Sequence, residues 1–155
     1  MEKSSTRKSK ATFVIEPSRL SHLEAIAGWV GTKSWYFRPW RSRKNDHSMV
    51  MTMNRRPVAY LSLLQHNRHS GDIYVLPSPQ LERSFKLVLR VWYMVSVYAF
   101  LTLELSKVYA SVRVDSQEEN EVLQLLGYRM VDPNCKVRRR TNEYICSRKE
   151  FKMVM

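Results

Sequence analysis

The alternation of apolar and polar residues along the chain predicts seven short strands. Residues 47–53 and 58–65 alternate in this way around a turn at 54–57, which predicts an antiparallel hairpin. β-Branched and aromatic residues mark the other strands that we expect, at 11–18, 72–76, 107–114, 128–131 and 141–147. Strands are therefore expected in both the first and the last parts of the chain.

Apolar residues at helical spacing predict three helices, at 18–30, 82–105 and 116–127. The longest has one apolar face, formed by Phe85, Val88, Leu89, Trp92, Val95 and Ala99. Its charge-free run from Val91 to Leu103 is thirteen residues long, whereas a bilayer span needs about 20. We therefore predict a buried helix and no transmembrane segment. Gly31 and Gly127 are the expected ends of the other two helices.

The order of these elements predicts one α/β domain with a central mixed, mostly antiparallel sheet flanked by helices. The long helix connects the strands at 72–76 and 107–114, and a helical crossover of this kind joins parallel neighbours. The chain has 155 residues, 44% of them apolar, which suits a single folded core. We expect a basic, flexible arm at 1–10 and the folded domain at 11–155.

The net charge of +12 comes from 26 Lys and Arg residues against 14 Asp and Glu residues. The excess is concentrated in two segments, which predict a basic face formed by Lys33, Arg38, Arg41, Arg43, Lys44, Arg138, Arg139 and Arg140. Such a face favours an anionic partner: nucleic acid, the ribosome, an acidic protein or a membrane surface. The alternative is a basic surface that serves solubility alone.

The cysteines and histidines do not indicate metal chemistry. Cys135 and Cys146 are the only cysteines, and neither they nor the four histidines have the spacing of a zinc site. We therefore predict no metal. No signal peptide precedes the cysteines, which predicts free thiols and a cytoplasmic location.

Residues 75–87 raise the question of a phosphate site. They form a predicted strand end, loop and helix start, where the first helical N–H groups lack partners within the helix and can hold an anion. Phosphate loops usually contain glycine so that the backbone can approach the anion closely, and this loop contains none.

Six positions in the second half of the chain follow a known pattern of helix end, strand and glycine-closed helix: Phe100, Val108, Ala110, Leu123, Gly127 and Tyr128. Together with the order of elements, they resemble the GNAT superfamily of acetyl-CoA-dependent N-acetyltransferases, nearest its ribosomal-protein N-acetyltransferase branch. The resemblance covers about residues 72–131, and the earlier elements match in order. It implies a fold in which two strands splay apart beside the long helix at Ser84.

The resemblance also implies acetyl-CoA or another acyl-CoA as cofactor, with its diphosphate held at the start of the long helix. Gln80 fits the family's loop pattern, whereas Arg83 and Phe85 stand where the family has small residues. Either the Arg83 guanidinium replaces backbone contacts to phosphate, or Arg83 and Phe85 fill the space and exclude the cofactor. Phe85 accordingly either joins the buried face of the helix or rims an open cleft. The remaining cofactor-binding residues implied are Val75, Ser84 and Ser116.

Asp72 and Tyr128 are the catalytic candidates implied by the resemblance. Asp72 would be the general base for an amine substrate, or alternatively a turn residue after Gly71. Tyr128 would be an acid, or alternatively a core residue. Two functions remain open: acetyl transfer from acetyl-CoA to an amine, and a catalytically silent scaffold that binds nucleic acid or an acidic protein through the basic face.

Overall fold

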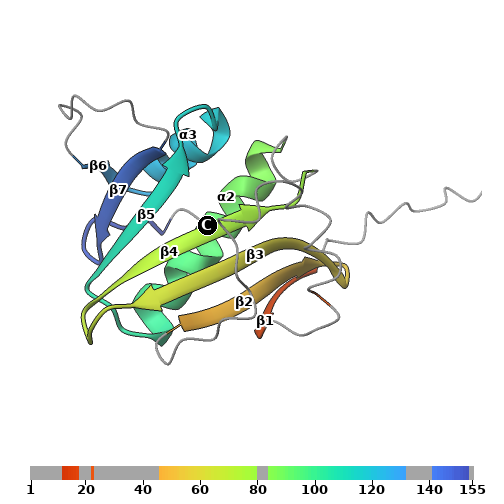
Figure 1. The fold of residues 1–155 in the computed structure, drawn as a ribbon, viewed down its shortest axis with the longest axis horizontal. Coiled ribbons are helices and arrows are strands. Elements are labelled where there is room, and N and C mark those ends of the chain that lie inside the picture. Colours follow the sequence, from red (N-terminus) through yellow and green to blue (C-terminus); the bar gives the residue numbers. More distant parts are fainter. Residues whose placement is uncertain (1–11, 18–21, 23–45, 80–83, 132–140, 154–155) are drawn as a thin grey trace, which may run out of the picture.

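A computed structural model describes residues 12–17, 22, 46–79, 84–131 and 141–153. The predicted arm at 1–10, all but one residue of the predicted helix at 18–30, and both basic segments lie outside these residues. The described residues form a single sheet with helices packed on it (Figure 1). This arrangement confirms the predicted α/β class.

The sheet has seven strands in the order β1-β2-β3-β4-β5-β7-β6. Their bounds are β1 Phe13–Pro17, β2 Asp46–Met53, β3 Arg56–Gln65, β4 Ser70–Pro77, β5 Lys107–Arg113, β6 Arg129–Met130 and β7 Thr141–Ser147. The pair β4–β5 is parallel, and the other pairs in the described sheet are antiparallel. The sheet is therefore mixed and mostly antiparallel, as predicted.

The predicted hairpin is present, and its turn is tight. Asn54 and Arg55 connect β2 to β3 with φ angles of +50° and +69°. Two residues with positive φ match the right-handed twist of the flanking strands. Asn54 also accepts a hydrogen bond through its side-chain oxygen from the Thr12 N–H at 3.0 Å, which fastens the turn to the residue before β1.

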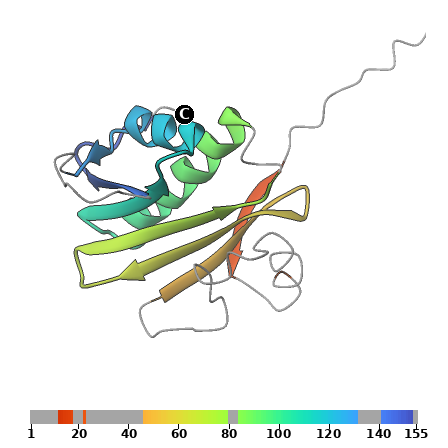
Figure 2. The same cartoon turned by 45° about the horizontal axis from the view of Figure 1, so that its top comes forward.

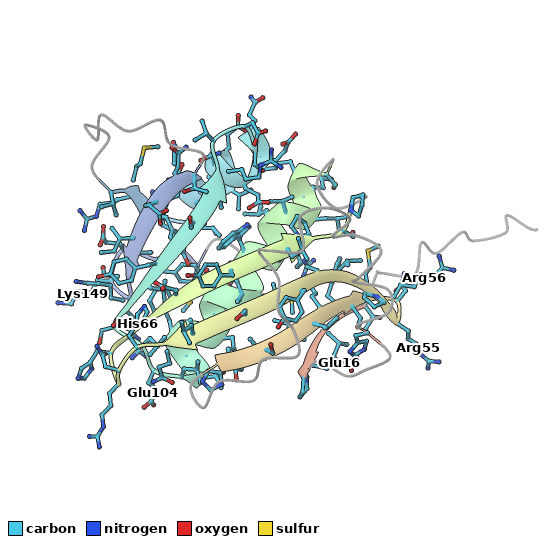
Figure 3. The ribbon with its side chains drawn as sticks, in the orientation of Figure 1. Glu16, Arg55, Arg56, His66, Glu104 and Lys149 are labelled. Carbon is cyan, nitrogen blue, oxygen red and sulfur yellow. The ribbon has the colours of Figure 1, made fainter. Side chains whose placement is uncertain are left out.

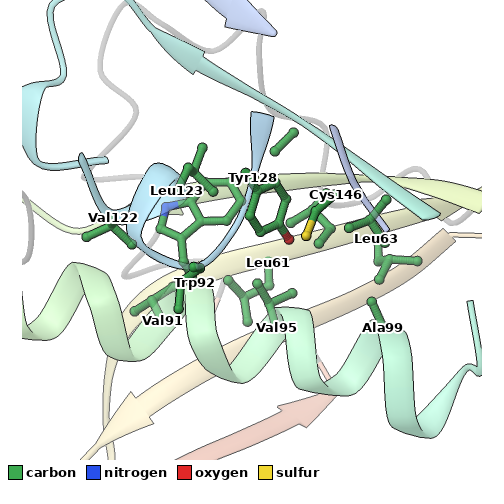
Figure 4. Packing of buried hydrophobic residues seen from close by; sticks show 14 of the residues in the cluster. Leu61, Leu63, Val91, Trp92, Val95, Ala99, Val122, Leu123, Tyr128 and Cys146 are labelled. Carbon is green, nitrogen blue, oxygen red and sulfur yellow. The ribbon is translucent and has the colours of Figure 1, made fainter. Parts of the chain in front are cut away.

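Helix α2 (Phe85–Val97) continues into the π-helical turn η3 (Tyr98–Thr102) and connects β4 to β5. It packs on one face of the sheet together with α3 (Gln117–Leu125), as Figure 2 shows. Between helices and sheet lies the hydrophobic core, whose α2 contribution includes Val88, Val91, Trp92 and Val95 (Figure 4). The prediction that this segment is a buried helix is confirmed for its middle and end.

The start of α2 differs from the prediction. The sequence pattern placed the helix start at residue 82 and Phe85 within the apolar face, but the helix begins at Phe85. A first-turn residue lies at the rim of the core, so the Phe85 side chain is 39% exposed and the buried face begins at Val88. The helix also ends at Thr102 instead of residue 105, through a π-helical turn.

The combined segment Phe85–Thr102 is long and apolar enough to cross a membrane by length and composition alone. Its buried side chains, however, face the sheet and α3 inside the protein core. We therefore interpret its apolar character as that of a central core helix.

Gly127 ends α3, as predicted, and the structure gives the reason. Its φ is +98°, a conformation that residues with a side chain rarely adopt. The Tyr128 N–H donates to the Leu123 carbonyl at 2.9 Å and the Gly127 N–H to the Gln124 carbonyl at 3.1 Å, which is the Schellman arrangement. A Cβ at Gly127 would lie 2.2 Å from the Glu150 carbonyl oxygen, so the close approach of the C-terminal segment also requires glycine.

Candidate functional site

The two parallel strands diverge along their length. Ser70–Ile73 of β4 pair with Lys107–Ala110 of β5, and the pairing stops there. Beyond that point β4 stays paired with β3 up to Pro77, while β5 stays paired with β7 up to Arg113. Residues Tyr74–Pro77 therefore have no described strand partner on the β5 side. This confirms the predicted pair of splayed strands.

Helix α2 begins next to the open end of this strand pair (Figure 1). Ser84 caps it: the hydroxyl oxygen accepts from the Leu87 N–H at 3.4 Å, and the carbonyl accepts from the Val88 N–H at 3.0 Å. The first turn, which lies entirely within the described residues, carries no acidic side chain. A helix N-terminus without acidic residues favours an anion through its free N–H groups and its dipole.

Phe85 stands at this helix start and does not seal it. With 39% of its surface exposed, its ring rims the open end and does not fill the core beneath it. Of the two alternatives for Phe85, the structure supports the rim. Gln80 and Arg83 lie outside the described residues, so their predicted contacts with a phosphate stay predictions.

Val75 and Ser116 lie on opposite sides of the divergence. Val75 is on the separated part of β4 and is partly buried against the core. Ser116 caps the start of α3 after β5, and its carbonyl accepts from the Asn120 N–H at 3.1 Å and from the Asn120 side chain at 2.7 Å. The two residues thus lie on the two sides of the divergence, and their cofactor contacts stay predictions.

Asp72 lies where the separation begins. It is the third residue of β4, opposite Tyr109 of β5 in the last part of the paired segment. Its Oδ2 lies 2.9 Å from the His66 Nε2 and accepts a hydrogen bond from the Tyr74 hydroxyl at 3.4 Å. The alternative of a turn residue is wrong, because Asp72 has strand partners on both sides. Figure 3 shows His66 just before β4 begins.

Three residues of this site were missed by the sequence analysis, namely His66, Tyr74 and Glu143. Tyr74 is 46% exposed on β4, and burial of part of its ring is the main cause that raises the Tyr74 pKa. The charge of Asp72, the hydrogen bond to Asp72 and the charge of Glu143 on β7 raise it further. Glu143 is oriented by Ser111, whose hydroxyl donates to the Glu143 Oε1 at 2.8 Å. The alternation within 72–76 could have paired Tyr74 with Asp72 on one face, but the position of Glu143 depends on β7 lying beside β5.

Tyr128 occupies a different environment, inside the core. Its side chain is 3% exposed and its hydroxyl is hydrogen-bonded to the Ser96 hydroxyl at 2.7 Å. Burial raises the Tyr128 pKa far above its ordinary value, so the phenol stays protonated. The core alternative accounts for all of these contacts. A catalytic role for Tyr128 stays a prediction.

The other predicted sites fall outside what can be tested. All eight residues of the predicted basic face lie outside the described part of the chain. Among the described residues, no three His, Cys, Asp or Glu side chains are grouped so that they could hold a metal ion. Cys146 is buried as a free thiol, and burial raises its pKa to about 12.

The described residues fit an elongated ligand with an anionic end and an amide-containing arm. The start of α2 offers N–H groups for the anion. The edge of Tyr74–Pro77 has no described β5 partner, and a ligand with amide groups can pair with such a strand edge. The indole Nε1 of Trp92 is a further donor that is buried without an acceptor in the described residues. An acyl-CoA has this combination of groups.

No protein-family model and no curated protein sequence matches the chain. Among solved structures, it is similar to spermidine N-acetyltransferase from Vibrio cholerae in complex with CoA and spermine. The TM-score is 0.71, with 12% identity over 89% of this chain and 96% of that one. It is also similar to the Campylobacter jejuni N-acetyltransferase PseH in complex with acetyl coenzyme A, with a TM-score of 0.68, 12% identity and coverage of 88% and 99%.

RimJ from Mycobacterium smegmatis, in complex with CoA-disulfide, gives a TM-score of 0.68 at 14% identity, covering 89% of this chain and 83% of that one. At these low identities the comparisons establish the fold. The chain has the fold of the GNAT N-acetyltransferases, as predicted, and the nearest branch within them stays a prediction.

Proposed function

We propose that the chain is an acyl-CoA-dependent N-acyltransferase that transfers an acetyl group to a primary amine. The observation that carries this proposal is the separation of β4 from β5 beyond Ile73 and Ala110, next to the capped N-terminus of α2. Support comes from the structural neighbours, which were solved with CoA or acetyl-CoA.

In this proposal, the first turn of α2 after Ser84 holds the cofactor's diphosphate, with Phe85 at the rim. Gln80 and Arg83 would assist, since a guanidinium pairs well with phosphate. Val75 and its strand neighbours would hold the arm of the cofactor, and Ser116 would border it from the α3 side. When bound, the cofactor supplies the acyl group as a thioester.

Asp72 is the residue that we propose as general base. A carboxylate at the point where the strands separate can take a proton from an incoming ammonium group and leave a nucleophilic amine. His66 and the Tyr74 hydroxyl both contact Oδ2 of this carboxylate and help to hold it in place. The nearby Glu143 adds a second negative charge, which favours a cationic amine over a neutral one.

Turnover tests the role of Asp72 directly. Acetyl transfer from acetyl-CoA would be measured by mass spectrometry with spermidine and with a short peptide that has a free N-terminus. We expect Asp72→Asn to lower kcat at least about 100-fold, as loss of a general base does, without weakening acetyl-CoA binding. Glu104→Gln, which removes an exposed carboxylate near the same end of the sheet, is the matched control and should leave turnover unchanged (Figure 3). Equal kcat in the Asp72 variant and its control would contradict the assignment.

The alternative is a catalytically silent scaffold that binds nucleic acid, the ribosome or an acidic protein in the cytoplasm through the predicted basic face. The net charge of +12 favours an anionic partner for either function. Retention on heparin should then fall steeply with salt, by roughly one unit of log affinity per unit of log salt for each phosphate-like contact. Retention with no salt dependence would contradict an anionic partner, and acetyl transfer would contradict a silent scaffold.

A further inference from the structure

Trp92 holds a buried hydrogen-bond donor that the described residues do not satisfy. Its side chain is 1% exposed, and its indole Nε1 has no acceptor among them. Most buried polar side chains in native proteins have a partner, because an unpaired donor in a low-dielectric core is costly. The buried donor of Trp92 is an exception to this rule and needs a physical explanation.

The neighbouring Tyr128 ring shows how another polar group in the same core finds a partner. Tyr128 packs edge-on against Trp92 with 6.5 Å between the ring centroids, and both side chains are buried in one core. The Tyr128 hydroxyl is paired with Ser96 at 2.7 Å, so this core does accommodate partners for polar groups. The Trp92 nitrogen lies on the other side of its ring, toward Val122 and Leu123 of α3, as Figure 4 shows. These two neighbours offer apolar side chains only.

The position of Trp92 along α2 can be compared with the position along β4 at which the two strands separate. Because β4 and β5 are parallel, the connecting helix α2 runs back along β4. Trp92 is seven residues after Phe85, which is about 10 Å along a helix. Tyr74, the first residue beyond the paired segment, is three residues before Pro77, which is also about 10 Å along a strand. When the start of α2 is taken as level with the end of β4, these lengths place Trp92 about level with the inner end of the opening.

We propose that the Trp92 indole N–H donates a hydrogen bond to the acyl end of the bound acyl-CoA. The identity of this ligand rests on the proposed function. A carbonyl oxygen is an acceptor that an indole N–H, which can only donate, is able to use. Since Trp92 is closed to solvent in the free protein, the contact requires the ligand to part the α2 and α3 side chains at this depth. Binding then pairs a donor that has no acceptor among the described residues.

Calorimetric titration with acetyl-CoA tests the contact. Trp92→Phe keeps an aromatic ring and removes the N–H, and we expect it to bind at least about fivefold more weakly than the parent chain. Phe100→Leu trims a ring from the same core at the far end of the α2–η3 segment, where Phe100 packs on Phe151 at 5.3 Å. This control should bind within about twofold of the parent, so that packing loss alone is separated from loss of the donor.

Nuclear magnetic resonance gives a readout independent of affinity. The Trp92 indole N–H signal, identified by its absence in Trp92→Phe, should move downfield when acetyl-CoA saturates the parent chain. Binding that is equal in the parent and Trp92→Phe, or an indole signal that does not move, would overturn this inference and leave the proposed function standing. A parent chain that does not bind acetyl-CoA would overturn the proposed function, and this inference with it.

Discussion

The two halves of the β4–β5 pair differ in what surrounds them. In the paired half, Ile73 of β4 and Val108 of β5 are fully buried beneath the helices. In the separated half, Tyr74 is 46% exposed, and Phe85 at the start of α2 is 39% exposed. The middle of α2 covers the helix-facing residues of the paired half, whereas the first residue of α2 and the Tyr74 side chain, which points to the other face of the sheet, are exposed. We infer that the paired half carries stability, and we propose the separated half, which has no described β5 partner, as the part available for binding.

The largest effect is expected at Gly127, which supports the paired half from the end of α3. Gly127→Ala would force a side chain into a φ of +98° and place its Cβ against the Glu150 carbonyl. We expect the free energy of unfolding to fall by about 3 kcal/mol or more. Denaturant unfolding followed by circular dichroism measures it. A decrease in the free energy of unfolding of less than about 1 kcal/mol would show that the C-terminal segment can move away from position 127 at little cost.

Ile73→Ala tests the paired half itself and should cost about 3 kcal/mol, because it opens a cavity in a fully buried site. Val75→Ala, two residues later on the same face of the strand but in the separated part, is its matched control. Val75 is only partly buried, so we expect a cost of about 1 kcal/mol. Equal losses from the same unfolding measurements would remove the distinction between the two halves.

Phe85→Ala tests the separated half and should cost less than about 1 kcal/mol, as expected for an exposed side chain. Together with Arg83→Gly, it restores the small residues of the family's phosphate loop. Because we propose that the Arg83 guanidinium pairs with the diphosphate, we expect the double variant to bind acetyl-CoA more weakly than the parent in calorimetry. A folded double variant that binds more tightly would show instead that these two side chains limit access to the site.

The smallest effect on stability at neutral pH is expected from two weakly acidic side chains buried in the core, Cys146 and Tyr128. Burial raises the Cys146 pKa from 9.0 to about 12 and also raises the Tyr128 pKa. Above pH 9 the unfolded chain loses protons that the folded chain keeps, so the free energy of unfolding should fall as pH rises from 9 to 12. Cys146→Ser should flatten this dependence in the same unfolding measurements. An unchanged pH profile would contradict a protonated, buried thiol.

The sequence predicted much of this framework because its signals are local. The hairpin alternation, the β7 strand at 141–147 and the helix end at Gly127 all depend on residues close together in the chain. Phe85 was ambiguous for a local reason as well. Helical spacing shows which residues share a face, but it does not show where the first turn leaves the core.

The candidate site was less predictable because it is made of long-range relations. The separation of β4 from β5 depends on each strand's other partner, β3 or β7. The charge of Glu143 acts on Tyr74 because β7 lies beside β5, and His66 contacts Asp72 across the turn before β4. Residue types alone could nominate Asp72, but they could not show that it lies where the strands part.

Amide hydrogen exchange with and without acetyl-CoA tests the central claim most directly. The account predicts that saturating acetyl-CoA slows exchange at Tyr74, Val75 or Leu76, whose strand edge has no described β5 partner, and in the first turn of α2. Exchange in Ser70–Ile73, already paired with β5, should stay nearly unchanged. No protection of residues 74–76 at millimolar acetyl-CoA, or protection confined to another part of the chain, would contradict the account.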